Sequence, residues 1–124
     1  MKRIKGILVL SLVFAILIPC TVYGAREGMS SLDYTSQKQV WIYYTGEEDE
    51  QGYSIRLTNQ WKQVWDNWYY FDEEGVSKQN TWAEINGKWY YFDEYSIMLH
   101  DTTTPDGYYV GSDGAWVQEE ATTQ

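Results

Sequence analysis

The run WYYFDE occurs twice in the chain, at positions 68–73 and 89–94, so the two copies lie 21 residues apart. An earlier tryptophan repeats with the same offset, as Trp61 and Trp82. Self-similarity at a fixed period is the signature of a repeat architecture, in which each unit buries its apolar face against its neighbours. This feature constrains the fold more strongly than composition does, because the chain cannot be an ordinary globule with one unrepeated core.

Each copy predicts a β-hairpin. Asn86 and Gly87 stand between two aromatic-rich runs, and Asn-Gly is the preferred pair for a type I′ turn because both central residues need positive φ. In the first copy Trp65 and Asp66 fall at the turn, which is a weaker turn signal. A single hairpin is marginal in water, so the hairpins must stack on one another. The prediction is an all-β fold, a short solenoid of stacked β-hairpins.

A two-residue turn at Asn86-Gly87 fixes which residues lie opposite one another. It sets Trp82 opposite Tyr91, and successive side chains along a strand point to opposite faces. Trp82, Trp89 and Tyr91 are therefore expected on one face of the hairpin, with Ala83, Tyr90 and Phe92 on the other. The same alternation gathers Trp61, Trp68 and Tyr70 on one face of the first copy.

Two weaker copies flank the clear ones. The stretch DGYYVGSDGAW places Tyr108, Tyr109 and Val110 in the Tyr-Tyr-Phe positions, and VWIYY resembles the start of an earlier unit. We therefore predict repeats over residues 40–116, clear in 61–81 and 82–102 and degenerate in 40–60 and 103–116. Seven Trp, ten Tyr and two Phe fall within residues 41–116, a density that repetition explains.

The N-terminal end of the chain predicts export. Residues 1–24 have a basic start, an apolar run at 6–18 and a break at Pro19, the pattern of a secretory signal peptide cleaved after Gly24. The apolar run of about 13 residues is shorter than the roughly 20 that a membrane helix needs, which disfavours the alternative of an uncleaved anchor. Residues 25–39 are polar and predict a flexible linker, and 117–124 predict a tail.

Cys20 is the only cysteine, and LIPC resembles a lipoprotein cleavage box in which Pro19 replaces the usual small residue, so lipidation stays open as an alternative. If the signal is cleaved, no cysteine is left for disulfides, thiolate catalysis or metal binding. Six basic and 18 acidic residues then remain, a net charge of −12. This balance disfavours nucleic acid and anionic lipid as partners and favours cationic or neutral polymers.

The segment WAEINGKWYYFDEYSIM resembles the cell-wall-binding repeat, or choline-binding repeat, of Gram-positive surface proteins. The resemblance implies a hairpin solenoid with aromatic cages between successive units, each made of two Trp, a Tyr from the neighbouring unit and often a Met. Three departures stand out: no Gly precedes the leading Trp, Ser77 stands at the place of Met98, and the third copy lacks the Trp of Trp-Tyr-Tyr. Carried over by position, the cage residues are Trp61, Trp68, Tyr70, Trp82, Trp89, Tyr91, Met98, Tyr109 and Trp116.

The resemblance predicts a secreted, wall-associated, non-catalytic module without a cofactor, which binds choline-bearing teichoic acid or a related envelope polymer through cation–π contacts. Two alternatives stay open: a glucan-binding repeat protein, and a structural scaffold for another secreted protein. A homodimer is also open.

The acidic residues predict neither catalysis nor metal binding. The acids of GEEDEQG lack the alternate spacing of a calcium loop, and those after each aromatic run sit in repeated turns rather than in a catalytic cleft. His100, the only histidine, has no nucleophile motif beside it and is expected in an exposed loop.

Overall fold

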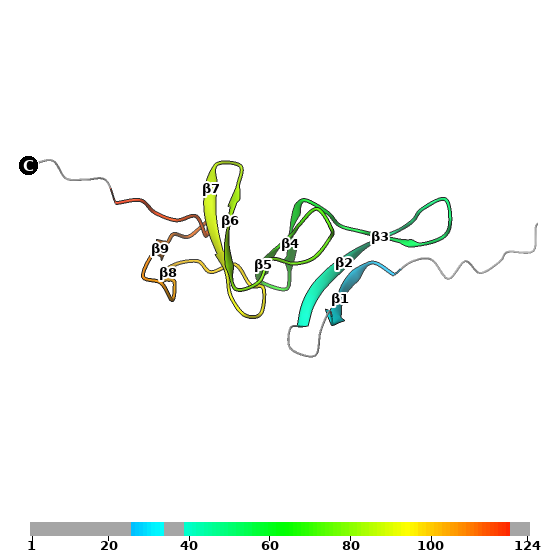
Figure 1. Cartoon of the computed structure of the whole chain (residues 1–124), viewed down its shortest axis with the longest axis horizontal. Coiled ribbons are helices and arrows are strands. Elements are labelled where there is room, and N and C mark those ends of the chain that lie inside the picture. The colour runs from blue at the N-terminus through cyan, green and yellow to red at the C-terminus, as the bar shows by residue number, and fades with distance from the viewer. Residues whose placement is uncertain (1–25, 34–38, 120–124) are drawn as a thin grey trace, which may run out of the picture.

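The computed structural model describes residues 26–33 and 39–119, and these residues form nine β-strands and no helix (Figure 1). The predicted signal peptide at 1–24 lies outside the described residues, and within them no helix is long and apolar enough to cross a membrane. The strands are β1 (Gly28–Asp33), β2 (Gln39–Glu48), β3 (Ser54–Arg56), β4 (Gln60–Val64), β5 (Asn67–Phe71), β6 (Thr81–Ile85), β7 (Lys88–Phe92), β8 (Thr102–Thr103) and β9 (Tyr109–Val110).

The strands form one three-stranded sheet, β1-β2-β3, followed by three two-stranded sheets, β4-β5, β6-β7 and β8-β9. Every pairing is between neighbours in sequence and is antiparallel. The units follow one another along the longest axis of the molecule, from β1-β2-β3 at one end to β8-β9 at the other (Figure 1). The predicted all-β solenoid of stacked hairpins is confirmed.

The turns of the two clear repeats explain their register. Asn86 and Gly87 have φ of 53° and 80°, as a type I′ turn requires, and Trp82 lies opposite Tyr91 as predicted. In the first repeat Trp65 has a φ of 56° while its turn partner Asp66 does not have positive φ. Positive φ at the first central residue alone is the pattern of a type II′ turn, which favours Gly there.

The acids that follow each aromatic run close tight turns. One carboxylate oxygen of Asp72 accepts backbone N–H groups of Glu74 at 2.9 Å and Val76 at 3.0 Å. Asp93 does the same for Tyr95 and Ile97, both at 2.9 Å. These Asx turns satisfy backbone donors that no strand partner reaches, so the repeated aspartates have a structural role.

The linker prediction for residues 25–39 is wrong for the six residues of β1. This strand pairs with β2 from Gly28 opposite Tyr44 to Asp33 opposite Gln39. Its polar sequence shows no hydrophobic periodicity, but an edge strand is held by backbone hydrogen bonds and needs only occasional apolar contacts. Met29 supplies one such contact, with the core cluster that contains Tyr43, Tyr69 and Phe71.

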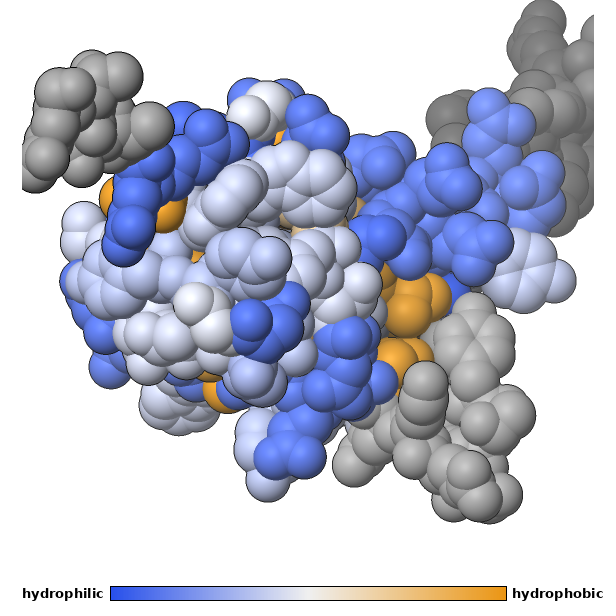
Figure 2. Space-filling model, turned by 60° about the vertical axis from the view of Figure 1, so that its left-hand side comes forward, coloured by the Kyte–Doolittle hydropathy of each residue, from blue (hydrophilic) through white to orange (hydrophobic). Residues whose placement is uncertain are grey.

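The core is divided between neighbouring units. One cluster contains Ala83, Ile85, Phe92 and Met98, and the other contains Tyr43, Tyr69 and Phe71. Phe71 and Phe92 are completely buried, at 0% exposure. The buried face of each hairpin is therefore the one opposite its two tryptophans. On the face shown in Figure 2 the surface is mostly hydrophilic or of intermediate hydropathy, and strongly hydrophobic residues show only in small patches.

Candidate functional site: two aromatic hollows

Backbone hydrogen bonds join each hairpin to the chain segment that follows the next one. The carbonyl of Trp68 accepts the N–H of Met98 at 2.9 Å, and the carbonyl of Trp89 accepts the N–H of Trp116 at 2.8 Å. The two junctions are therefore built alike. At each of them the structure has a hollow lined by aromatic side chains of two successive units.

We number the two hollows in chain order. The second hollow, between β6-β7 and the C-terminal unit, has a volume of about 280 Å³ and is lined by Trp82, Trp89, Tyr108 and Trp116. The rings meet nearly edge to face: Trp82 and Tyr108 have centroids 5.9 Å apart at 83°, and Tyr108 and Trp116 have centroids 5.6 Å apart at 82°. Such contacts hold rings at steep angles to one another. The result is a small open site whose lining is entirely aromatic.

The first hollow, between β4-β5 and β6-β7, is larger, about 550 Å³. Its aromatic part is built from Trp61, Trp68 and Tyr90, with Met98 beside them. Trp61 and Tyr90 have centroids 4.8 Å apart at 74°, which ties the two hairpins together. Polar side chains complete the lining: Gln63, Asp66, His100, Ser112 and Asp113.

The two hollows use equivalent positions of successive repeats. In order along the chain, Trp61, Trp68, Tyr90 and Met98 of the first correspond to Trp82, Trp89, Tyr108 and Trp116 of the second. Six of the nine site residues predicted from the sequence are thus brought together, three in each hollow. Trp68 and Trp89, each 40% exposed, leave ring surface open to solvent.

The other three predicted residues, Tyr70, Tyr91 and Tyr109, do not line either hollow. Tyr70 and Tyr91 pack edge to face against Trp61 and Trp82 of their own hairpins, in both cases with centroids 5.3 Å apart. Tyr109 lines an adjoining surface depression, which shares Tyr108 and Trp116 with the second hollow.

Tyr90 and Tyr108, which the sequence did not predict as site residues, take the place expected for Tyr70 and Tyr91. The pleat assigned Tyr90 to the buried face of its own hairpin, and in the stacked solenoid that face covers the leading tryptophan of the preceding unit. The family resemblance implies that each cage takes a Tyr from the neighbouring unit. Choosing this Tyr from the face opposite that unit's own tryptophans would have identified both Tyr90 and Tyr108.

The junction between β2-β3 and β4-β5 has a different construction. Ser77 stands where the other two junctions have Met98 and Trp116, and its hydroxyl accepts the N–H of Trp41 at 3.0 Å and donates to Ser96 at 2.8 Å. Ser77 is buried, at 4% exposure. A buried, hydrogen-bonded serine therefore stands here at the position where the other two junctions have a side chain that lines a hollow.

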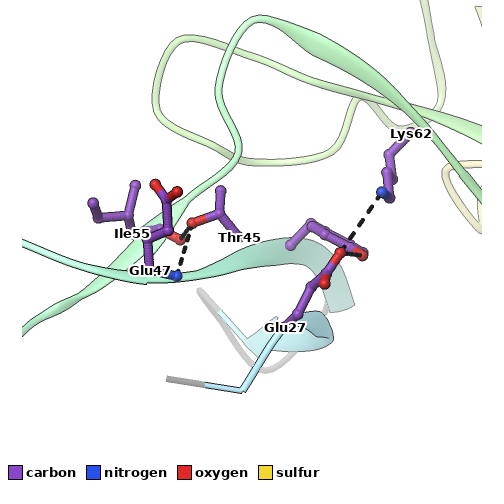
Figure 3. A network of polar contacts seen from close by, with 6 residues as sticks. Glu27, Thr45, Glu47, Ile55 and Lys62 are labelled. Carbon is purple, nitrogen blue, oxygen red and sulfur yellow. Dashed lines mark hydrogen bonds and ion pairs between the residues drawn. The ribbon is translucent and has the colours of Figure 1, made fainter. Parts of the chain in front are cut away.

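A lysine of the chain lies over an aromatic ring at this N-terminal junction. The Nζ of Lys62 is 4.9 Å from the ring centroid of Tyr43 and 3.9 Å from Glu27, toward which it points in Figure 3. The Tyr43 hydroxyl donates to Glu27 at 2.8 Å, and burial, followed by this hydrogen bond, raises the pKa of Tyr43. An internal ammonium group thus occupies the aromatic face here.

Asp106 orients one wall of the second hollow. Its carboxylate accepts the indole N–H of Trp82 at 2.8 Å and the hydroxyl of Thr104 at 2.6 Å. The Thr104 hydrogen bond, and then that of Trp82, lower the pKa of Asp106, so this carboxylate stays ionised at neutral pH. A fixed negative charge at the indole edge favours a cation over the ring.

The remaining acidic residues do not form a metal site. Within residues 26–33 and 39–119, no group of three or more His, Cys, Asp and Glu side chains could hold a metal ion. His100 is exposed and pairs through Nδ1 with the neighbouring Asp101 at 2.8 Å. The chemistry offered by the described residues is therefore that of open aromatic surfaces with carboxylates nearby.

Comparison with known proteins identifies the repeat. The choline-binding repeat matches residues 76–116, and the cell wall binding repeat matches residues 59–77. No curated protein sequence matches the chain.

Among solved structures, the choline binding domain of Spr1274 from Streptococcus pneumoniae is similar, with 29% identity and a TM-score of 0.56 over 75% of this chain and 96% of that one. CbpJ from the same species has 30% identity and a TM-score of 0.54, covering 74% of this chain and 27% of its own. Choline binding protein F, also pneumococcal, has 31% identity and a TM-score of 0.50, covering 75% and 27%. The chain thus spans nearly all of the first structure and about a quarter of the other two. Residues 59–116 are repeats of the cell-wall-binding, or choline-binding, family.

Proposed function

We propose that this chain is a secreted, non-catalytic module that attaches to the cell wall by binding choline groups of a wall polymer, such as a teichoic acid, in its aromatic hollows. The observation that carries the proposal is the second hollow, where four aromatic side chains from two units surround one small open space. The pneumococcal proteins of similar structure are choline-binding proteins by name, which supports the same ligand.

The trimethylammonium group of choline suits such a lining. It has no N–H to donate and is attracted to the negative faces of aromatic rings, by about 0.5–2 kcal/mol for each ring. Three rings would supply roughly 2–6 kcal/mol, which brackets the ~4 kcal/mol of millimolar binding. A single hollow is therefore a weak site.

Attachment to a wall would come from using both hollows on one polymer. Both lie along one solenoid, and a polymer that repeats choline can occupy them together. Linked sites of this kind gain factors of about 10²–10⁴ in avidity when the geometry permits. The net negative charge adds long-range attraction, although salt screens it beyond ~8 Å.

A choline titration followed by tryptophan fluorescence and calorimetry tests the proposal. We expect saturation in the millimolar range and release of the protein from purified cell walls by excess choline. Trp89→Ala, which removes one wall of the second hollow, should weaken choline binding, while Trp65→Ala, at a tryptophan that is 92% exposed and lines neither hollow, is the matched control. Retention on walls at tens of millimolar choline would contradict the proposal.

A further inference from the structure

We propose that the two hollows differ in their selectivity among ammonium ions: both accept a quaternary ammonium group, but the second excludes a protonated primary amine, which the first binds at least as well. The inference rests on the proposed function, because it concerns the ligand class of the same two sites. It starts from the contrast in their linings, which is largest among the polar residues.

The two kinds of ammonium ion differ in what they need from a site. A quaternary ammonium has no N–H and interacts with ring faces alone, whereas a primary ammonium carries three donors. A donor that leaves water without finding an acceptor destabilises the complex. An all-aromatic site therefore disfavours the primary ion, and a site with free acceptors favours it.

The second hollow offers few acceptors. Its lining is three tryptophans and Tyr108, and a phenolic hydroxyl is the only side-chain oxygen among them. The nearby carboxylate of Asp106 already accepts two hydrogen bonds, from Trp82 and Thr104. Asp106 does not itself line the hollow, so it contributes negative charge at the indole edge of Trp82 rather than an acceptor inside the hollow.

The first hollow has acceptors of the required kind. Asp66 and Asp113 both line it beside Trp61, Trp68 and Tyr90. Among the described residues Asp66 has no hydrogen-bond or ion-pair partner, so both of its oxygens can accept. A carboxylate beside aromatic faces suits an ion that combines positive charge with N–H donors.

The net charge at the first hollow is negative even when the ion pair between Asp113 and Lys88 is counted. Asp113 lies 3.7 Å from Nζ of Lys88 and accepts the N–H of Ala115 at 3.0 Å, so its charge is largely balanced. Asp66 is unbalanced, and both aspartates are exposed, so side chains can adjust to a ligand. The larger volume, about 550 Å³ against about 280 Å³, also leaves room for a group that keeps part of its hydration.

Choline and ethanolamine are a matched pair of probes, because they share one skeleton and differ only in the three methyl groups on nitrogen. The full chain would be titrated with each by calorimetry in two variants: Trp68→Ala, which leaves the second hollow, and Trp89→Ala, which leaves the first. We expect Trp68→Ala to prefer choline by about tenfold. Trp89→Ala should bind ethanolamine at least as tightly as choline.

Asp66→Asn with Asp113→Asn provides a test that leaves every aromatic ring in place. In the Trp89→Ala background, this change should lower ethanolamine affinity by about tenfold and choline affinity much less. Equal choline preference in Trp68→Ala and Trp89→Ala would overturn the inference while leaving the proposed function intact. If the unmodified chain did not bind choline at all, the proposed function itself would be overturned.

Discussion

The two hollows share their framework but differ in the side chains placed on it. Each has two tryptophans from one hairpin and a tyrosine from the next, yet Met98 completes the first and Trp116 the second. Two residues before that tyrosine, Lys88 stands in the unit that completes the first hollow and Asp106 in the unit that completes the second. Backbone stacking therefore fixes where the hollow-lining positions lie, while the side chain at each position can differ from one repeat to the next.

The largest effect should come from the hairpin that both hollows share. Phe92 is fully buried, and its ring centroid lies 5.7 Å from that of Trp61. Phe92→Ala should lower the free energy of unfolding by about 3–5 kcal/mol and weaken choline binding at both hollows. Urea denaturation and calorimetry measure the two effects.

Val110→Ala is the control for this change, because Val110 is also fully buried but belongs to the C-terminal unit. It removes less volume, so its effect on stability should be smaller, and the first hollow should keep its affinity. If Phe92→Ala spared either hollow, the shared hairpin would not be the common support of both.

A pair of glycines isolates the packing of Met98. Gly114 and Gly87 have φ of 82° and 80°, so alanine is strained equally at either position. A Cβ at Gly114 would collide with the thioether of Met98, whereas a Cβ at Gly87 meets no atom within 4 Å. Gly114→Ala should therefore destabilise the protein by about 1–3 kcal/mol more than Gly87→Ala, measured by urea denaturation. Equal losses would show that Met98 moves aside freely.

Sequence reasoning predicted the hairpins well because their signals are local. The Asn86-Gly87 turn and strand alternation fix the register, and the 21-residue period requires stacking. Strand alternation did not indicate that Tyr90 and Tyr108 line the hollows, because the rotation between stacked hairpins, which brings Tyr90 over Trp61, is set by tertiary packing rather than by any one strand. Strand β1 was missed since a polar edge strand has no hydrophobic pattern to detect.

The turn beside the first hollow should respond in the opposite sense, by gaining stability. Trp65 is 92% exposed and has positive φ, a conformation that costs an L-residue roughly 1–2 kcal/mol. Trp65→Gly should raise the free energy of unfolding by about 0.5–1 kcal/mol after the added flexibility of glycine is included. Thermal denaturation measures the change.

Asn86→Gly at the equivalent turn is the control and should be close to neutral, because Asn already tolerates positive φ. A loss of stability in Trp65→Gly would mean that the exposed indole makes a stabilising contact.

The smallest effect should be the acid response of the second hollow. Because its hydrogen bonds lower the pKa of Asp106, the stabilisation from its ionised form is fully present above the ordinary Asp pKa of about 4. It is lost as the pH falls through the lowered pKa. Choline affinity of the second hollow, measured in Trp68→Ala between pH 7 and 3, should stay level and decline only at the acid end. Asp106→Asn should remove this decline, and an equal decline in that variant would assign it to another group.

The interior hairpin β6-β7 lines both hollows, since it gives Trp82 and Trp89 to one and Tyr90 to the other. A gene duplication that adds one 21-residue repeat would therefore insert a new hairpin together with a complete new hollow, and the existing hollows would keep their lining residues. A protein built of such repeats can thus gain hollows one at a time, and no hollow has to evolve from an unrelated surface.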